Sequence, residues 1–248
     1  KVAFDKKKGN ITSYVFKKQE YIKSKKGPQI NFWRPPTDND LGSRMPTQNL
    51  GWKNASLNAT VSNFDFKKLN NNLIQVVVSY QLPTVKTSHT TTYTINGNGV
   101  VKIENTLDAS AYKGDIPRVG MRMQIPKKFK DVMYYGRGPW ENYQDRKSST
   151  FIDVFNTTVS DFYVPYIRPQ ENGNRTDVRW MALMDDEEYG LLISSPSQKG
   201  LSISALHMPN EAFDITNDLD YSKENKNVNF SKHTTDIKEQ NLVQLNID

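Results

Sequence analysis

Apolar side chains along this chain recur mainly at every second position. Residues 74–82 carry Ile, Val, Val, Tyr and Leu at alternate positions, which is typical of a strand with one buried face. Residues 93–103 alternate on both sides of an Asn-Gly-Asn-Gly sequence, which predicts a β-hairpin. Further strands are predicted at 201–205 and 243–247, and a second hairpin at 4–16, turning at 8–10.

Helical periodicity is weak, since no segment keeps the 3, 4, 7 apolar spacing beyond about two turns. Residues 191–193, Leu-Leu-Ile, are interpreted as a more deeply buried strand, and the three asparagines at 70–72 as a turn. Turn residues recur at the regular intervals typical of sandwiches and barrels. We therefore predict an all-β fold, one large antiparallel β-sandwich that occupies residues 1–248 as a single domain.

Composition removes several classes of chemistry. The chain has no cysteine, which excludes disulfide frameworks, thiolate zinc sites and cysteine nucleophiles. Its three histidines, His89, His207 and His233, stand far apart and form no metal-binding pair such as HExxH. We therefore expect neither a histidine metal site nor a histidine-based catalytic triad.

The charge and the hydropathy of the chain argue against two classes of partner, nucleic acids and membranes. The 33 basic and 27 acidic residues give a net charge of +6, but the two signs are mixed along the chain. We favour a solvated surface over a nucleic-acid partner. No run approaches the ~18 apolar residues that span a bilayer, so no membrane partner is expected. Both ends fall within strand patterns, and the first residue is not Met, which suggests a piece of a longer protein.

Three stretches interrupt the alternation, at residues 31–42, 134–146 and 163–175, the last continuing to Trp180. They are polar, aromatic and rich in Pro, Gly and Arg, which is typical of ordered loops with packed side chains. Any recognition or chemistry is expected in these stretches.

The Asp38-Asn39-Asp40 triplet in the first stretch has two interpretations. Alternating carboxylate and amide oxygens suit calcium, but the remaining ligand positions of an EF-hand loop are missing. The alternative is that these side chains cap the backbone of an irregular turn. We favour capping and predict no metal on this chain.

Glu141 and Glu171 in the other two stretches are each followed by asparagine. A glycosidase needs two carboxyl groups about 5–10 Å apart, one acting as the acid. The alternative is pairing with neighbouring arginines, which would lower both pKa values and spoil these groups as acids. We favour pairing, with the candidate partners Arg137, Arg146, Arg175 and Arg179.

Aromatic rings in these stretches could stack on the C–H faces of a sugar, with Asn, Asp and Arg binding its hydroxyls. They could equally anchor the loops to the core. Composition alone leaves both interpretations open for Trp33, Trp140, Trp180, Tyr143 and Tyr166.

Together the three stretches resemble the C-terminal domain, also called the small-chain or fifth domain, of the bacterial β-galactosidases of glycoside hydrolase family 2. Residues 31–42 resemble that family's Arg-(Ala/Pro)-Pro loop with Asp-Asn-Asp. Residues 135–146 resemble its Gly-x-Gly-Pro-x-Glu-Asn-Tyr-x-Asp-Arg motif, and 163–175 its Tyr-x-x-Pro-x-Glu-Asn-Gly-x-Arg motif. The motifs stand in the family's order, and the resemblance covers essentially the whole chain.

The resemblance implies a galactose mutarotase-like supersandwich and a bacterial parent enzyme, cytoplasmic or periplasmic, that hydrolyses terminal β-D-galactosides with retention. Both catalytic glutamates of the family lie in a preceding (β/α)₈ barrel, of which this chain shows no βα alternation. The chain is thus expected to hold no catalytic residue, to be inactive alone, to brace the barrel and to shape the substrate pocket. Magnesium and a monovalent cation are expected in the parent, none on this domain, and the parent is expected to be a homo-oligomer.

Two departures from the family are visible. The chain stops at Asp248, before the family's Asp-Ser-Trp loop that reaches the sugar, and His207 matches no mutarotase catalytic motif. The alternative function is a carbohydrate-binding module for galactosides. Under either function, the candidate sugar-facing or interdomain residues are Arg34, Asp38, Asn39, Asp40, Arg137, Trp140, Glu141, Asn142, Tyr143, Asp145, Arg146, Gln170, Glu171, Asn172, Arg175, Arg179 and Trp180.

Overall fold

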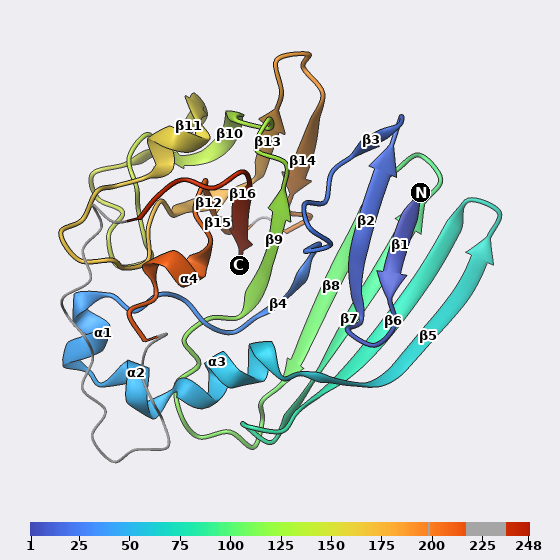
Figure 1. Cartoon of the computed structure of the whole chain (residues 1–248), viewed down its shortest axis with the longest axis horizontal. Helices are drawn as coiled ribbons and strands as arrows, with labels where there is room; N and C mark the ends of the chain where they lie inside the picture. The colour runs from blue at the N-terminus through green and yellow to red at the C-terminus, as the bar shows by residue number, and fades with distance from the viewer. Residues whose placement is uncertain (198, 217–236) are drawn as a thin grey trace.

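The computed structural model describes residues 1–197, 199–216 and 237–248. Antiparallel sheets dominate the described residues, with short helices along one side (Figure 1). Two sheets follow chain order: β1 (Val2–Asp5), β2 (Asn10–Phe16) and β3 (Gln19–Glu20) in one, and β5 (Thr60–Asn70), β6 (Leu73–Leu82), β7 (Thr87–Asn96) and β8 (Val101–Asp108) in the other.

Two further sheets join strands that are distant in sequence. The first has the order β12 (Arg175–Val178), β15 (Leu201–Leu206), β16 (Val243–Ile247), β9 (Gly120–Ile125) and β4 (Gln29–Asn31). The second has the order β11 (Phe151–Thr158), β10 (Asp131–Gly138), β13 (Trp180–Met184) and β14 (Gly190–Ser194). The all-β antiparallel fold is confirmed, whereas the more specific supersandwich stays a prediction.

The alternating segments form strands where the sequence predicts them. The β7–β8 hairpin turns between Asn96 and Val101, and β6, β15 and β16 cover the other alternating runs. The β1–β2 hairpin packs on the sheet of β5–β8, since the ring of Phe4 lies 5.1 Å from that of Tyr93. Gly9 in its turn has a φ of +72° and accepts a 2.8 Å hydrogen bond from the Tyr80 hydroxyl.

The prediction for residues 191–193 was wrong in one respect. They form a strand, β14, but this strand is an edge of its sheet and pairs with β13 alone. Leu192 is 63% exposed, while Leu191 and Ile193 are half-buried. An apolar run cannot by itself distinguish a central strand from an edge strand with an apolar outer face.

The three interrupting stretches are not loops throughout. Strand β10 includes residues 134–138, and β12 begins at Arg175. Gly136 and Gly138 occupy buried positions of β10, and a Cβ at Gly136 would stand 2.8 Å from the backbone of Val178. The alternation was hidden here because buried glycines carry no apolar side chain.

The first stretch ends in a short helix over Asp38–Gly42, and two further helices connect it to the long β5–β8 sheet (Figure 1). Trp52 on the third of them is fully buried, with its ring 5.4 Å from that of Phe32. None of the helices in the described residues combines the length and the apolar character that crossing a bilayer requires. The helices are α1 (Asp38–Gly42), α2 (Met45–Gln48), α3 (Leu50–Leu57) and α4 (Asn210–Phe213), with a 3₁₀ helix at Val159–Phe162.

Candidate functional site

The three motif stretches meet at one pocket of about 420 Å³. Arg34 comes from the first stretch, Tyr143 from the second and Glu171 from the third. Arg118, just before β9, and Asp248, just after β16, add further charges to its lining, together with Asp177 and Lys199. The fold thus brings together side chains that are far apart in the sequence, in a volume suited to a small ligand.

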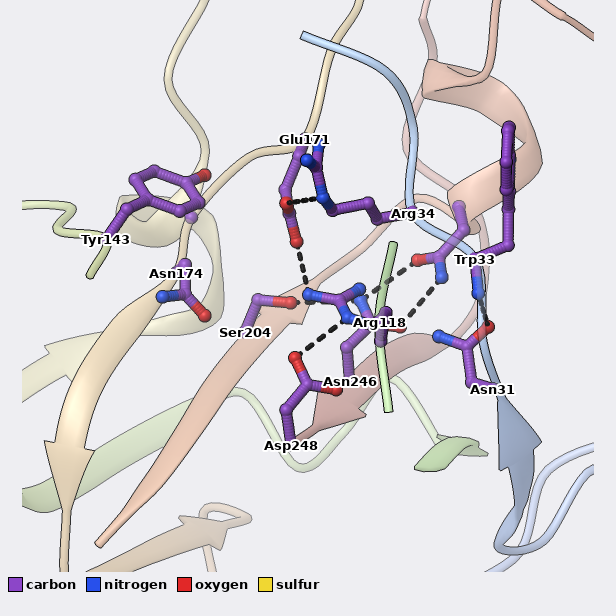
Figure 2. Close-up of polar contacts among 12 residues, drawn as sticks. Asn31, Trp33, Arg34, Arg118, Tyr143, Glu171, Asn174, Ser204, Asn246 and Asp248 are labelled. Carbon is purple, nitrogen blue, oxygen red and sulfur yellow. Dashed lines mark hydrogen bonds and ion pairs between the residues drawn. The ribbon is translucent and has the colours of Figure 1, made fainter. Parts of the chain in front are cut away.

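A chain of ion pairs crosses this pocket. The Arg118 guanidinium lies between two carboxylates, donating to Glu171 and standing 2.8 Å from Oδ2 of Asp248 (Figure 2). The second oxygen of Glu171 lies 3.5 Å from Nε of Arg34. Glu171 and Arg118 are both more than nine-tenths buried, so water screens this pair little.

Arg34 connects the chain of ion pairs to helix α1. Its Nη2 donates to Oδ1 of Asp40 at 2.8 Å, and Oδ2 of Asp40 accepts from the Thr37 backbone N–H at 2.8 Å. Burial alone would raise the pKa of the Asp40 carboxyl, but the bonds from Arg34 and Thr37 outweigh it and lower that pKa. Thr37 and Asp40 form a capping box, which confirms the capping interpretation for Asp40.

Glu141 holds the second and third stretches together. Its side chain is almost fully buried, and one oxygen accepts from both Arg146 and the Tyr166 hydroxyl. The other oxygen accepts from the backbone N–H of Gly173 at 2.6 Å and from the Tyr143 hydroxyl at 3.3 Å. The predicted pairing with Arg146 is confirmed.

The predicted partners of Glu171 were wrong. It pairs with Arg34 and Arg118, not with an arginine of its own stretch. The other candidate arginines bind elsewhere: Nε of Arg137 donates to Asp177 at 2.9 Å, and Arg175 lies 4.4 Å above the Phe162 ring. Arg179 donates to the Asp177 carbonyl. Sequence proximity misleads here, because strand pairing brings remote cations closer.

The asparagines that follow the two glutamates act as backbone clamps. Asn142 donates to the Trp140 carbonyl at 2.8 Å and accepts from the Thr176 N–H at 2.9 Å. Asn172 donates to the Val164 carbonyl at 2.6 Å and accepts from the N–H of the same residue at 2.8 Å. Both amides are buried, and in each the oxygen and the nitrogen bind the backbone of the loops, so these side chains shape the loops.

The aromatic side chains divide between the two interpretations. Trp33 is buried and donates from Nε1 to Asp214 at 2.8 Å, as expected of a loop anchor. Trp140 is 68% exposed, and Trp180 is half-buried on β13. Burial, with the negative charges of Glu171 and Glu141 adding to it, raises the pKa of the Tyr143 hydroxyl well above its ordinary value.

Of the predicted site residues, only Arg34, Tyr143 and Glu171 line the pocket, and the others lie outside its lining. Asp38, Asn39 and Asp145 are exposed, and Gln170 is half-buried. Conversely, sequence reasoning missed Arg118 and Asp248, together with the segment 199–202. Asp248 follows a predicted strand and Arg118 follows Pro117 in a segment for which no strand is predicted, so no short-range pattern connects either residue to the motif stretches.

The pocket is lined by both positively and negatively charged side chains, and one of its carboxyl groups has a shifted pKa. Burial raises the pKa of the Asp248 carboxyl to about 6, although Arg118 opposes the shift. In the described residues, Oδ1 of Asp248 and Nη1 of Arg118 are buried without a hydrogen-bond partner. The site can therefore offer an acceptor and a donor. The described residues contain no cluster of three or more acidic or histidine side chains suited to a metal.

The two histidines that the structure describes lie outside the lining of the pocket. His89 is buried between Thr91 and Asn105, at 3.2 and 3.1 Å, and burial lowers its pKa. His207 bonds through Nδ1 to the Leu242 carbonyl at 3.0 Å. His233 lies outside the described residues.

Comparison with known proteins finds one family over the whole chain and relatives over most of it. The family described as beta galactosidase small chain matches residues 1–248. A beta-galactosidase of Priestia megaterium is 37% identical over 213 residues, which cover 86% of this chain and 20% of that protein. One of Lactobacillus delbrueckii subsp. bulgaricus is 32% identical over 224 residues, covering 87% and 22%. The chain thus spans about a fifth of the length of these relatives.

Proposed function

The chain belongs to the beta-galactosidase small-chain family, and we propose that it is the non-catalytic C-terminal domain of a retaining family 2 β-galactosidase. In this role its motif loops brace the catalytic barrel and form part of the wall of the substrate pocket. The observation that carries the proposal is that both motif glutamates are held by arginines within this chain. The β-galactosidase relatives, which are about five times longer, support it.

The geometry argues against hydrolysis by these two residues. A glycosidase acid must present a free carboxyl oxygen to the glycosidic bond. Each oxygen of Glu141 already accepts two hydrogen bonds, from Arg146, Tyr166, Gly173 and Tyr143. These bonds fix the loops relative to one another, which is the property that a supporting wall needs.

Hydrolysis of a nitrophenyl β-galactoside tests this role. The purified 248-residue chain is expected to release no nitrophenol above the buffer rate, and appreciable turnover by it would overturn the proposal. In the longer enzyme, Glu141→Gln is expected to reduce stability, with kcat falling far less than the roughly 100-fold or greater loss that removing a general acid causes. Asp145→Asn, at an exposed position of the same loop, is the control.

A second candidate function is galactoside binding by the domain itself. It is favoured by the 68% exposure of Trp140, on a loop whose Tyr143 lines the polar pocket. Titrating the four tryptophan indole signals with lactose, observed by nuclear magnetic resonance, separates the two functions. Saturable shifts that disappear in Trp140→Ala would support binding, and unchanged signals at tens of millimolar lactose would remove it.

The partners and cofactors follow from the same proposal. The partners are the remaining domains of the parent chain, the galactoside that they hydrolyse and further copies of the parent enzyme. Magnesium and a monovalent cation would serve the catalytic domain, while this domain holds none. Removing divalent cations with EDTA is therefore expected to leave the thermal unfolding midpoint of the 248-residue chain unchanged, and a clear decrease would contradict the metal-free proposal.

A further inference from the structure

The outer face of the sheet of β11, β10, β13 and β14 is mostly apolar at its centre, where Asn156 and Ser194 are the polar members. Along β10, Val132 and Tyr134 are buried, so Met133 and Tyr135 point to the opposite face. The register places Tyr135 between Val154 of β11 and Trp180 of β13. It also places Met133 beside Ala182 of β13, which pairs in turn with Leu192 of β14. We call these seven residues the outer-sheet patch: Met133, Tyr135, Val154, Trp180, Ala182, Leu192 and Ile152, which pairs with Arg137.

The outer-sheet patch is open to solvent in the described residues. Leu192 is 63% exposed, Val154 48%, Ile152 39% and Tyr135 37%. The other three members are half-buried. These side chains occupy all four strands of the sheet at paired positions and so form one continuous surface across it. Figure 1 shows this sheet along the top of the view, with β5–β8 below it and to the right.

The sheet of β5–β8 shows what a solvated face looks like in this protein. Its outward positions on β7 are Ser88, Thr90, Thr92 and Thr94, and Thr92 pairs with Glu104 of β8. One-sided antiparallel sheets ordinarily carry such polar residues on the water side. The outer-sheet patch departs from this pattern, and a contiguous exposed apolar surface of this kind marks an interaction site.

We propose that the outer-sheet patch is the surface on which another part of the same, longer polypeptide packs. The chain spans only about a fifth of its relatives, so most of such a polypeptide lies outside the structure. This inference rests on the membership in a longer enzyme that is part of the proposed function, but not on the role of the motif loops.

The charged side chains at the border of the patch indicate the chemistry of the packing partner. Arg179 lies 5.6 Å above the Tyr135 ring, and Arg137, at the border of the patch, is paired with Asp177. Because Arg137 already has a carboxylate partner within this chain, the contacting surface need not supply one. We expect that surface to be aliphatic and aromatic at its centre, as in the core of a stable interface.

Hydrogen exchange tests the proposal directly. Amide exchange of peptides covering 151–156 and 190–194 is measured in the 248-residue chain and in the longer protein that contains it. We expect exchange about tenfold or more slower in the longer protein, because packing excludes water and suppresses local opening. Equal exchange rates in the two proteins would overturn the proposal.

Substitutions identify the occupant. Val154→Lys and Leu192→Lys in the longer protein are expected to abolish the added protection while leaving the unfolding midpoint of the 248-residue chain nearly unchanged. Val100→Lys is the matched control, since Val100 is 58% exposed in a hairpin turn outside the patch. Protection that already exists in the 248-residue chain and grows with its concentration would identify a second copy, and concentration-independent protection would identify a segment of this chain. Either would overturn the proposal, whereas the test of the motif loops by β-galactoside hydrolysis would stand.

Discussion

The Glu171 carboxylate accepts a hydrogen bond from the Arg118 guanidinium, although 53 residues separate the two in sequence. Arg118 also lies 2.8 Å from Asp248, so one cation connects the third motif stretch to the end of β16. Charges removed from water are stable only when paired and hydrogen-bonded. The pair therefore fixes the motif loop against the sheet that carries it.

Glu171→Gln is expected to lower the free energy of unfolding by about 3 kcal/mol, because it leaves Arg118 buried with one of its two anions removed. Urea denaturation of the 248-residue chain measures this loss. Glu104→Gln is the control, since its pair with Lys102 is half exposed on both sides, and such pairs contribute under about 1 kcal/mol. Equal losses of unfolding free energy in the two variants would show that the buried pair stabilises the fold no more than an exposed pair does.

Asp248 is expected to make stability fall as the pH rises between about 4 and 6. Burial raises its pKa to about 6 in the folded chain, whereas the pKa of an aspartate in the unfolded chain is about 3.9. Within this window the folded state holds a proton that the unfolded state has lost. The stabilisation is thus complete below the unfolded pKa and lost as the pH rises through the folded pKa.

The measurement is the difference in unfolding free energy between the native chain and Asp248→Asn at several pH values. Subtraction removes the opposite contributions of Asp40 and Asp185, whose pKa values are lowered in the folded state. The unfolding free energy of the native chain should fall relative to that of the variant from about pH 4 to 6, and the difference should stay constant above about pH 6. A flat difference would show that Asp248 titrates normally.

Asn142→Ala is expected to cost about 2–4 kcal/mol, because it leaves the buried Thr176 N–H and two partly buried carbonyls without this partner. Asn142 is fully buried and connects the Trp140 carbonyl to the Thr176 N–H. Thermal unfolding gives the comparison with Asn39→Ala, which removes an exposed amide on α1 and should change stability by under about 0.5 kcal/mol. Similar thermal unfolding midpoints for the two variants would contradict the proposed role of Asn142 as a backbone clamp.

The tryptophans are expected to separate into a structural and a surface class. Trp52→Ala should cost about 3–5 kcal/mol, since the ring is fully buried against Phe32. Trp140→Ala should stay within about 0.5 kcal/mol of the native chain, because most of its ring is in water. Chemical denaturation checks both, and a large loss in Trp140→Ala would mean that this ring is a loop anchor.

Strands with one apolar face could be predicted from the sequence alone, because alternate side chains of a strand point to the same side of its sheet and only one register buries the apolar ones. Strand β6 and the β7–β8 hairpin follow this rule. The rule fails for residues 134–138, where Gly136 and Gly138 are buried without side chains. It also fails for the burial of β14, since an edge position depends on which strands arrive elsewhere in the chain.

The sequence by itself determined the antiparallel all-β class, the positions of the alternating strands such as β6, β7, β8, β15 and β16, and the motif stretches that identify the family. These depend on local periodicity and on residue types at short spacing. Only the tertiary structure decided that Glu171 pairs with Arg118 and Arg34, that Asp248 completes the pocket and that the outer-sheet patch is exposed. Such contacts arise from strands that pair across the whole chain, and no short-range pattern records which of them will meet.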